Sequence, residues 1–112
     1  MSDYIYKELS KDQWAEVIEK ARNAESSGLH LFLLRSLANE QTVPAGSLAA
    51  YKGEVMNDLL DRRLGSSSIG TISTWVRQVT GDQRDTFYQW NEVQGNWMIG
   101  WSQAQSLRAA LK

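Results

Sequence analysis

The sequence predicts a small α+β domain with helices first, then a three-stranded antiparallel sheet, then one last helix. Three observations lead to this prediction. Apolar residues stand at helical spacing in the first part of the chain. After the run Ser66-Ser67-Ser68 the chain becomes rich in aromatic and β-branched residues, which favour strands. The chain has 112 residues, 42% of them hydrophobic and 22% charged, which is typical of one globular domain over residues 1–112.

The first helix is expected over residues 10–26. Ser10 suits the position that caps a helix, and Gln13 three residues later completes a capping box. Gly28 suits the left-handed conformation that commonly follows the end of a helix. Between these signals lies the apolar stripe of an amphipathic helix, formed by Trp14, Val17, Ile18 and Ala21.

Two more helices are predicted before the sheet. The second covers residues 29–38 and is apolar on most of its sides, so we expect it to be buried. Pro44 separates it from the third helix, residues 47–64, which Gly65 is placed to end. The apolar stripe of the third helix consists of Leu48, Tyr51, Val55, Met56, Leu59 and Leu60.

The sheet is predicted as a meander of residues 69–79, 86–94 and 97–101, followed by a helix over 102–111 that Ser102 caps. Gly95-Asn96 suits a two-residue hairpin turn, because both residues tolerate a positive φ. Pairing Gln94 with Trp97 would place Trp90 opposite Trp101. Residues at a spacing of two then share one face, namely Tyr88, Trp90, Trp97, Ile99 and Trp101.

Two alternatives stay open at this point. Residues 69–79 are interpreted as a strand, but they also fit the start of a recognition helix. The aromatic segment has a competing interpretation as a helix, because its apolar residues also stand three or four apart. Gly95 and Gly100 argue against that second helix.

Composition removes several classes of chemistry. The chain has no cysteine, which excludes disulfides, thiolate nucleophiles and zinc–thiolate sites. His30 is the single histidine and lies among leucines, which is typical of a structural residue. Asp58 and Asp61 lie beside arginines, which favours ion pairs over metal binding. We therefore predict no catalytic residues, no metal and no cofactor.

The sequence also limits the cellular locations and the classes of partner that we expect. The first residues lack the basic and apolar segments of a secretory signal, and the apolar stretch 29–37 is too short to span a bilayer. A cytoplasmic protein without a membrane partner is expected. The net charge of −1 argues against an acidic mimic of DNA and against a strongly basic binding protein.

Five tryptophans in so short a chain are the unusual feature of the composition. Large rings are rarely all fully buried in a small domain, and exposed tryptophans are typical anchors of protein interfaces. The leading hypothesis is therefore a non-enzymatic inhibitor, adaptor or regulatory subunit of cellular, phage or mobile-element origin. Its partner is a protein, with a second copy of the chain included. The predicted contact residues are Tyr88, Trp90, Trp97 and Trp101.

The alternative hypothesis is a DNA-binding transcriptional regulator. Leu64-Gly65 followed by residues 71–77 resembles the turn and the recognition-helix start of many bacterial repressors, which would place a helix-turn-helix at residues 59–79 and make the aromatic hairpin a wing. The resemblance implies contacts to duplex DNA from Arg62, Arg63, Thr71, Ser73, Thr74, Arg77 and Arg84. The predicted order of elements from residue 47 also resembles the double-stranded-RNA-binding fold, but only in topology, because residues 102–105 are neutral.

Overall fold

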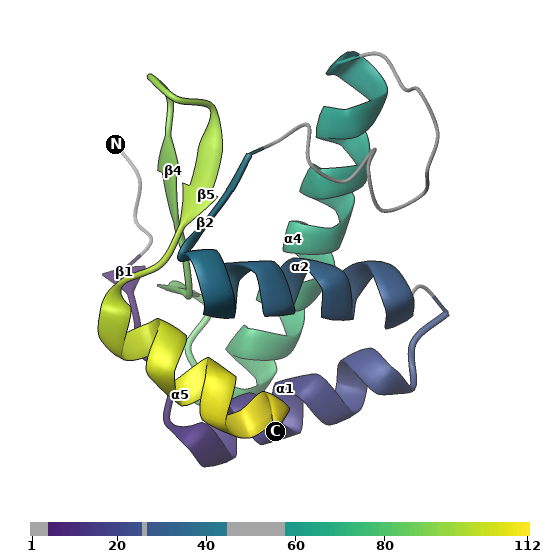
Figure 1. Ribbon diagram of the computed structural model, residues 1–112. Helices are drawn as coiled ribbons and strands as arrows, with labels where there is room; N and C mark the ends of the chain where they lie inside the picture. Colours follow the sequence, from purple (N-terminus) through teal and green to yellow (C-terminus); the bar gives the residue numbers. More distant parts are fainter. Residues whose placement is uncertain (1–4, 26, 45–57) are drawn as a thin grey trace.

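The chain forms an α+β fold, as the sequence predicts (Figure 1). The computed structural model describes residues 5–25, 27–44 and 58–112, and the side chains of these ranges except those of 58–67. The described elements are, in order, β1 (Ile5–Tyr6), α1 (Lys11–Arg22), α2 (Ser27–Glu40), β2 (Thr42–Pro44), α4 (Asp58–Thr80), β3 (Asp85–Thr86), β4 (Gln89–Asn91), β5 (Asn96–Met98) and α5 (Trp101–Leu111).

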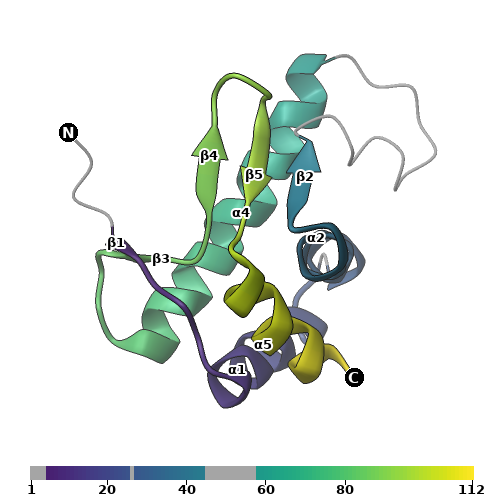
Figure 2. The same ribbon diagram turned by 60° about the vertical axis from the view of Figure 1, so that its left-hand side comes forward.

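The helices α1, α2 and α5 gather at one end of the molecule, and the strands β2, β5 and β4 rise from that end beside the long helix α4 (Figures 1 and 2). α1 packs against α5, α2 and α4, and α2 also contacts α5 and α4. The core lies between the helices and one face of this sheet. It includes Trp14, Leu34, Ile72, Phe87 and Leu107, all fully buried.

The start of α1 confirms the predicted capping box. The Gln13 backbone N–H donates to Ser10 Oγ at 3.2 Å, and the Ser10 N–H donates to Gln13 Oε1 at 3.0 Å. The four residues of the predicted stripe are buried. The predicted end is wrong, because α1 ends at Arg22, four residues earlier than expected, and Asn23 is its C-cap residue. Gly28 lies inside α2, which covers Ser27–Glu40 rather than 29–38.

The predicted strand over 69–79 is wrong, because α4 runs without interruption from Asp58 to Thr80. Gly65 does not end a helix, and most of the predicted helix 47–64 lies outside the described residues. Ile69, Ile72 and Val76 are buried at a spacing of three and four, so helical packing outweighs the strand preference of their side chains. Thr74 Oγ1 donates to the Gly70 carbonyl at 3.1 Å, a bond that threonine commonly makes within helices.

The sheet has three antiparallel strands, as predicted, but their order is β2-β5-β4 rather than that of a meander. The third strand is β2 and not residues 69–79, and it pairs with the central strand β5 through Val43 and Trp97, whereas the meander would place the third strand next to residues 86–94. Because β2 has only three residues and ends at Pro44, it lacks the alternating pattern by which strands are recognised in a sequence. The remaining strands, β1 and β3, form a separate parallel pair that was not predicted.

The predicted hairpin register is also wrong. The last pair of the hairpin is Asn91 with Asn96, so the loop has four residues, Glu92 to Gly95, rather than the turn Gly95-Asn96. Gly95 supplies a φ of 68°, and the Gln94 N–H donates to Asn91 Oδ1 at 3.1 Å. Trp90 therefore pairs with Trp97 and not with Trp101. Trp101 is the first residue of α5. The N-cap residue of this helix is Gly100, whereas Ser102 was expected.

One buried amide joins the two ends of the described chain. The Gln103 side chain on α5 is fully buried, and its Oε1 accepts from the Leu9 N–H at 2.7 Å and from Trp14 Nε1 at 3.2 Å. Its Nε2 donates to the Lys7 carbonyl at 2.8 Å and to the Phe87 carbonyl at 3.0 Å. All four hydrogen bonds that a glutamine amide can form are thus made within the protein.

Glycine substitutions test the helical assignment of residues 69–79. Gly70 lies inside α4 with open space where a Cβ would stand, so Gly70→Ala should raise the free energy of unfolding by about 0.5–1 kcal/mol. Gly81 follows the end of α4 with a φ of 81°, so Gly81→Ala should lower it by about 1 kcal/mol. Urea unfolding measures both changes. A destabilising Gly70→Ala would contradict a helix at this position.

Replacing the buried amide should be costly. Gln103→Met keeps the size of the side chain but leaves two N–H groups and two carbonyls without partners, so we expect a loss of about 2–4 kcal/mol in the free energy of unfolding. Gln105→Met, at an exposed position of the same helix, is the matched control and should change stability by less than about 0.5 kcal/mol. Equal stabilities of the two variants would show that the Gln103 network does not stabilise the fold.

Candidate functional site

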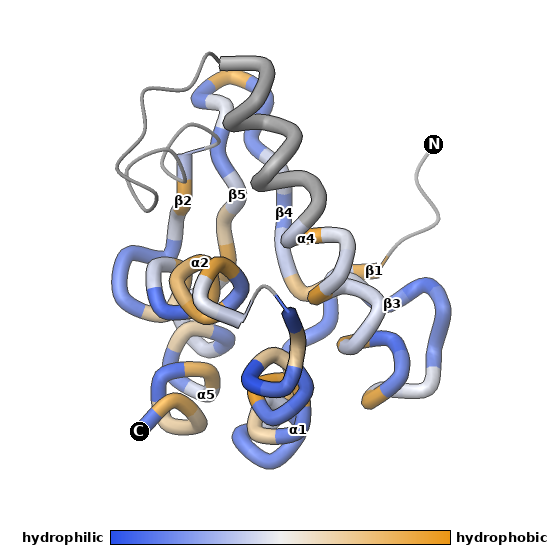
Figure 3. The backbone as a smooth tube through the Cα atoms, turned by 90° about the vertical axis from the view of Figure 1, so that its right-hand side faces the viewer, coloured by the Kyte–Doolittle hydropathy of each residue, from blue (hydrophilic) through white to orange (hydrophobic). Residues whose placement is uncertain are grey.

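Large apolar side chains reach the solvent on and next to the β4–β5 hairpin. Of the described residues, the exposed large hydrophobics are Val93 at 96%, Trp101 at 62%, Ile5 at 51% and Trp90 at 45% exposure. Val93 lies in the hairpin loop, which carries an apolar segment at its tip, far from α1 and α5 (Figure 3). We call Trp90, Val93 and Trp101 the hairpin surface, because they mark the edge, tip and base of this hairpin.

The sheet positions Trp90 at its edge. Val43, Trp97 and Trp90 stand opposite one another on β2, β5 and β4, so their side chains form one row across the sheet. The rings of Trp90 and Trp97 have centroids 5.5 Å apart at 54°. Exposure rises along this row from 1% at Val43 to 5% at Trp97 and 45% at Trp90. The row therefore begins in the core and ends in solvent.

Trp101 is held in place by the start of α5 and not by the sheet. It is the first residue of α5, and the preceding Gly100 donates its N–H to Tyr6 Oη at 2.8 Å. Burial raises the pKa of Tyr6, which outweighs the lowering effect of the Gly100 hydrogen bond. The Tyr6 hydroxyl therefore stays neutral at physiological pH and fixes the start of α5 beside β1.

The four predicted contact residues separate into two groups. Trp90 and Trp101 are exposed, as a contact residue must be. Tyr88 is partly buried and lies edge-on against Phe87, with ring centroids 5.0 Å apart. Trp97 lies in the core, and its ring packs against the ring of Trp90. The predicted common face is therefore wrong for Trp101, because the strand ends at Met98.

The predicted helix-turn-helix at residues 59–79 is wrong, because α4 has no turn between Asp58 and Thr80. Its expected contact residues are scattered. Ser73 is buried, Thr71 is partly buried and Thr74 is exposed. Arg62 and Arg63 lie on α4, but their side chains are outside the described part.

The two remaining arginines of that hypothesis are engaged near the end of α4. Arg77 Nε donates to the Asp85 carbonyl at 3.4 Å. Arg84 Nη2 lies 3.4 Å from Asp82 Oδ2 in an exposed ion pair. Hydrogen bonds from the backbone and side chain of Arg84 lower the pKa of the Asp82 carboxyl.

His30 is a residue of α2, and its side chain contacts α4 in a way that is typical of a structural histidine. Its Nδ1 is 2.8 Å from Ser68 Oγ, and its ring meets Trp75 edge-on with centroids 5.2 Å apart. His30 is 5% exposed and Ser68 is fully buried, so a substrate cannot reach this serine–histidine pair in the described conformation. Burial lowers the pKa of His30 and favours the neutral imidazole.

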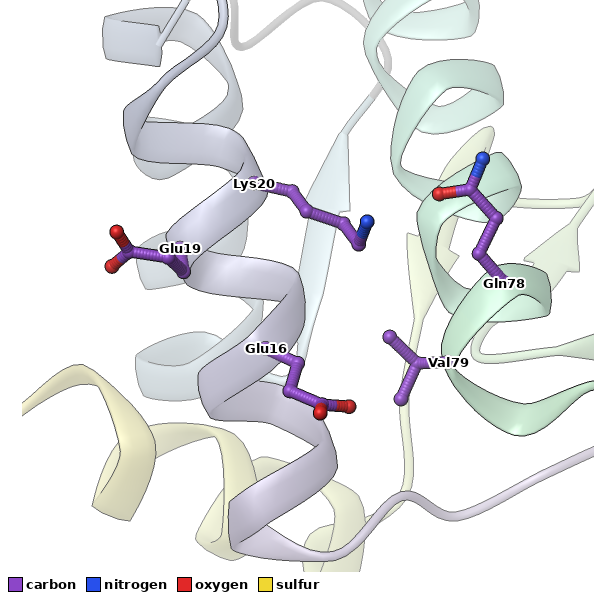
Figure 4. A pocket seen from close by; sticks show the side chains of 5 residues that line it. All are labelled: Glu16, Glu19, Lys20, Gln78 and Val79. Atoms are coloured by element: carbon purple, nitrogen blue, oxygen red, sulfur yellow. The ribbon is translucent and has the colours of Figure 1, made fainter.

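A groove of about 540 Å³ lies between α1 and α4 (Figure 4). The Lys20 amine and the Gln78 and Val79 side chains point into the space between the helices, whereas Glu19 points away from it. No pattern in the sequence indicates this groove, because Glu16 and Glu19 follow the pattern of an ordinary solvated helix face. Its lining mixes both charges with a single apolar side chain, which selects no class of ligand.

Other kinds of site are not found within the described ranges. Among the described side chains, which exclude those of residues 58–67, no three His, Cys, Asp or Glu residues are placed to hold a metal ion. The described helices also include none with the length and apolarity needed to cross a membrane. Comparisons with protein-family models, curated protein sequences and solved structures give no significant match. The hairpin surface is therefore the best-supported candidate site.

The environment of His30 makes the fold sensitive to acid. The unfolded chain binds a proton at this residue near pH 6.5, whereas burial lowers the pKa in the folded state. The contribution to stability is therefore complete above pH 6.5 and is lost as the pH falls below it, by at most about 1.4 kcal/mol per pH unit. Urea unfolding from pH 7.5 to pH 5.2 should show this loss, and His30→Gln should remove it. An identical pH slope in both proteins would contradict the assignment.

Proposed function

We propose that this protein acts by binding a protein partner through the hairpin surface, as an inhibitor, adaptor or regulatory subunit. The observation that carries the proposal is the exposure of Trp90 and Trp101. Trp14 and Trp97, in contrast, are buried in the core of the same domain. Exposed apolar rings gain free energy when a partner removes them from water, at about 25 cal/mol per Å² of buried apolar surface. Tryptophan is also the residue type that most often dominates the energy of protein interfaces.

A protein partner fits the charges around the hairpin better than a nucleic acid does. Single strands that stack on aromatic side chains also need cations that follow the phosphates. The hairpin loop itself carries the acidic Glu92, and Arg84, in the loop before β3, is paired with Asp82. The chain as a whole has a net charge of −1. These features favour an apolar contact with a polar rim, which is the usual organisation of protein interfaces.

Site-specific photo-crosslinking tests the proposal in cells of the source organism. A photoreactive phenylalanine analogue replaces Trp90 or Trp101 in the full chain, and the control replaces exposed Arg35 on α2. We expect adducts with the same protein from both hairpin positions and none from the control. The captured protein, once purified, should bind the Trp90→Ser/Trp101→Ser variant at least about tenfold more weakly than the wild type, which is about 1.4 kcal/mol.

Two results would overturn the proposal. One is a set of adducts that does not differ between Trp90, Trp101 and Arg35. The other is salt-dependent binding to duplex DNA, measured by mobility shift at low and moderate salt, that the double tryptophan substitution leaves unchanged.

A further inference from the structure

The free edge of β4 exposes the backbone of Trp90. The Ile99 N–H donates to the carbonyl of Gln41, the residue before β2, at 2.9 Å. The backbone N–H of Ile99 therefore points toward β2 and away from β4. Backbone groups alternate along a strand, so Trp97, two residues earlier, also bonds toward β2. Its partner Trp90 is therefore in a non-hydrogen-bonded pair with it. The Trp90 N–H and C=O consequently point away from β5, toward the open edge of the sheet.

Apart from the shortness of β4, this edge lacks the features that usually prevent strand pairing. Within the described ranges, β4 is an outer strand and pairs with β5 alone. Its residues Gln89, Trp90 and Asn91 include no lysine, no proline and no inward charge, which are the usual protections. The opposite edge strand, β2, does end with a proline, Pro44. The two edges of the sheet thus differ, and β4 is the one open to another strand.

The sequence of β4 complements itself. In an antiparallel pair related by a two-fold axis at Trp90, this residue stands opposite Trp90 of the partner subunit, and the two exchange both backbone hydrogen bonds. Gln89 then stands opposite Asn91 of the partner subunit, so amides meet amides and no like charges face each other. The row from Val43 through Trp97 to Trp90 would continue without a break into the same row of the second copy.

We propose that the partner of this edge is a second copy of the chain, paired antiparallel through β4 into a continuous six-stranded sheet. The proposal rests on the proposed function, because it names a partner for the Trp90 part of the hairpin surface. Pairing would cover the exposed part of Trp90, at the end of the row where burial decreases outward. A strand of three residues gives a small interface, so we expect a weak dimer with a dissociation constant on the order of 100 µM.

Sedimentation velocity of the full chain, from about 5 µM to about 500 µM, measures this association directly. Two matched double variants test the register. Gln89→Asp/Asn91→Asp places like charges opposite each other across the two-fold axis, whereas Gln89→Lys/Asn91→Asp places opposite charges there. Both keep an acceptor at position 91 for the Gln94 N–H, so both should retain the hairpin loop. Thermal unfolding at the lowest concentration confirms that each variant is folded.

We expect the wild type to dimerise with concentration, the Asp/Asp variant to weaken the dimer at least about tenfold, and the Lys/Asp variant to keep it or strengthen it. A wild type that is monomeric throughout, or equal association of the two variants, would overturn the proposal. The crosslinking experiment is independent of this outcome. A different protein captured at Trp90 and Trp101 by a monomeric chain would leave the proposed function standing without the dimer.

Discussion

The amide of Gln103 is the interaction on which the rest of the structure depends. It joins α5 to the segment that precedes α1, to the Trp14 indole on α1 and to the Phe87 carbonyl before β4. A buried amide is tolerated only when its donors and acceptors all find partners, so these four groups must occupy one arrangement. The parallel pairing of β1 with β3 and the hydrogen bond from Gly100 to Tyr6 lie directly beside this network.

The hairpin surface follows from that arrangement. With the start of α5 fixed against β1, the chain has only Ile99 and Gly100 in which to pass from β5 into the helix. Trp101 is therefore placed at the base of the sheet with its ring in solvent, while Trp97 four residues earlier is buried. The same hairpin thus contributes one tryptophan to the core and exposes another, Trp90, at the edge of the sheet. Neighbouring but different rings thus serve the core and the proposed interaction.

Local signals in the sequence predicted what depends on local interactions. The capping box at Ser10 and the stripe of α1 were found because capping and helical spacing act within a few residues. Residues 69–79 were misassigned because strand preference is weaker than the tertiary burial of Ile69, Ile72 and Val76. Gln103 gave no signal, since its environment comes from residues up to 96 positions away. Trp90 and Trp101 could be proposed as contacts, but their exposure depends on a register that only the fold defines.

The distance in sequence between the partners of Gln103 has a consequence for how the chain folds. Contacts between residues 94 to 96 positions apart form only when the two ends of the described chain are brought together. Closing such a loop costs entropy that the local contacts of α1 or of the hairpin do not recover on their own. The helices should therefore gain and lose their packing together, in one slow and cooperative step rather than in a series of independent ones.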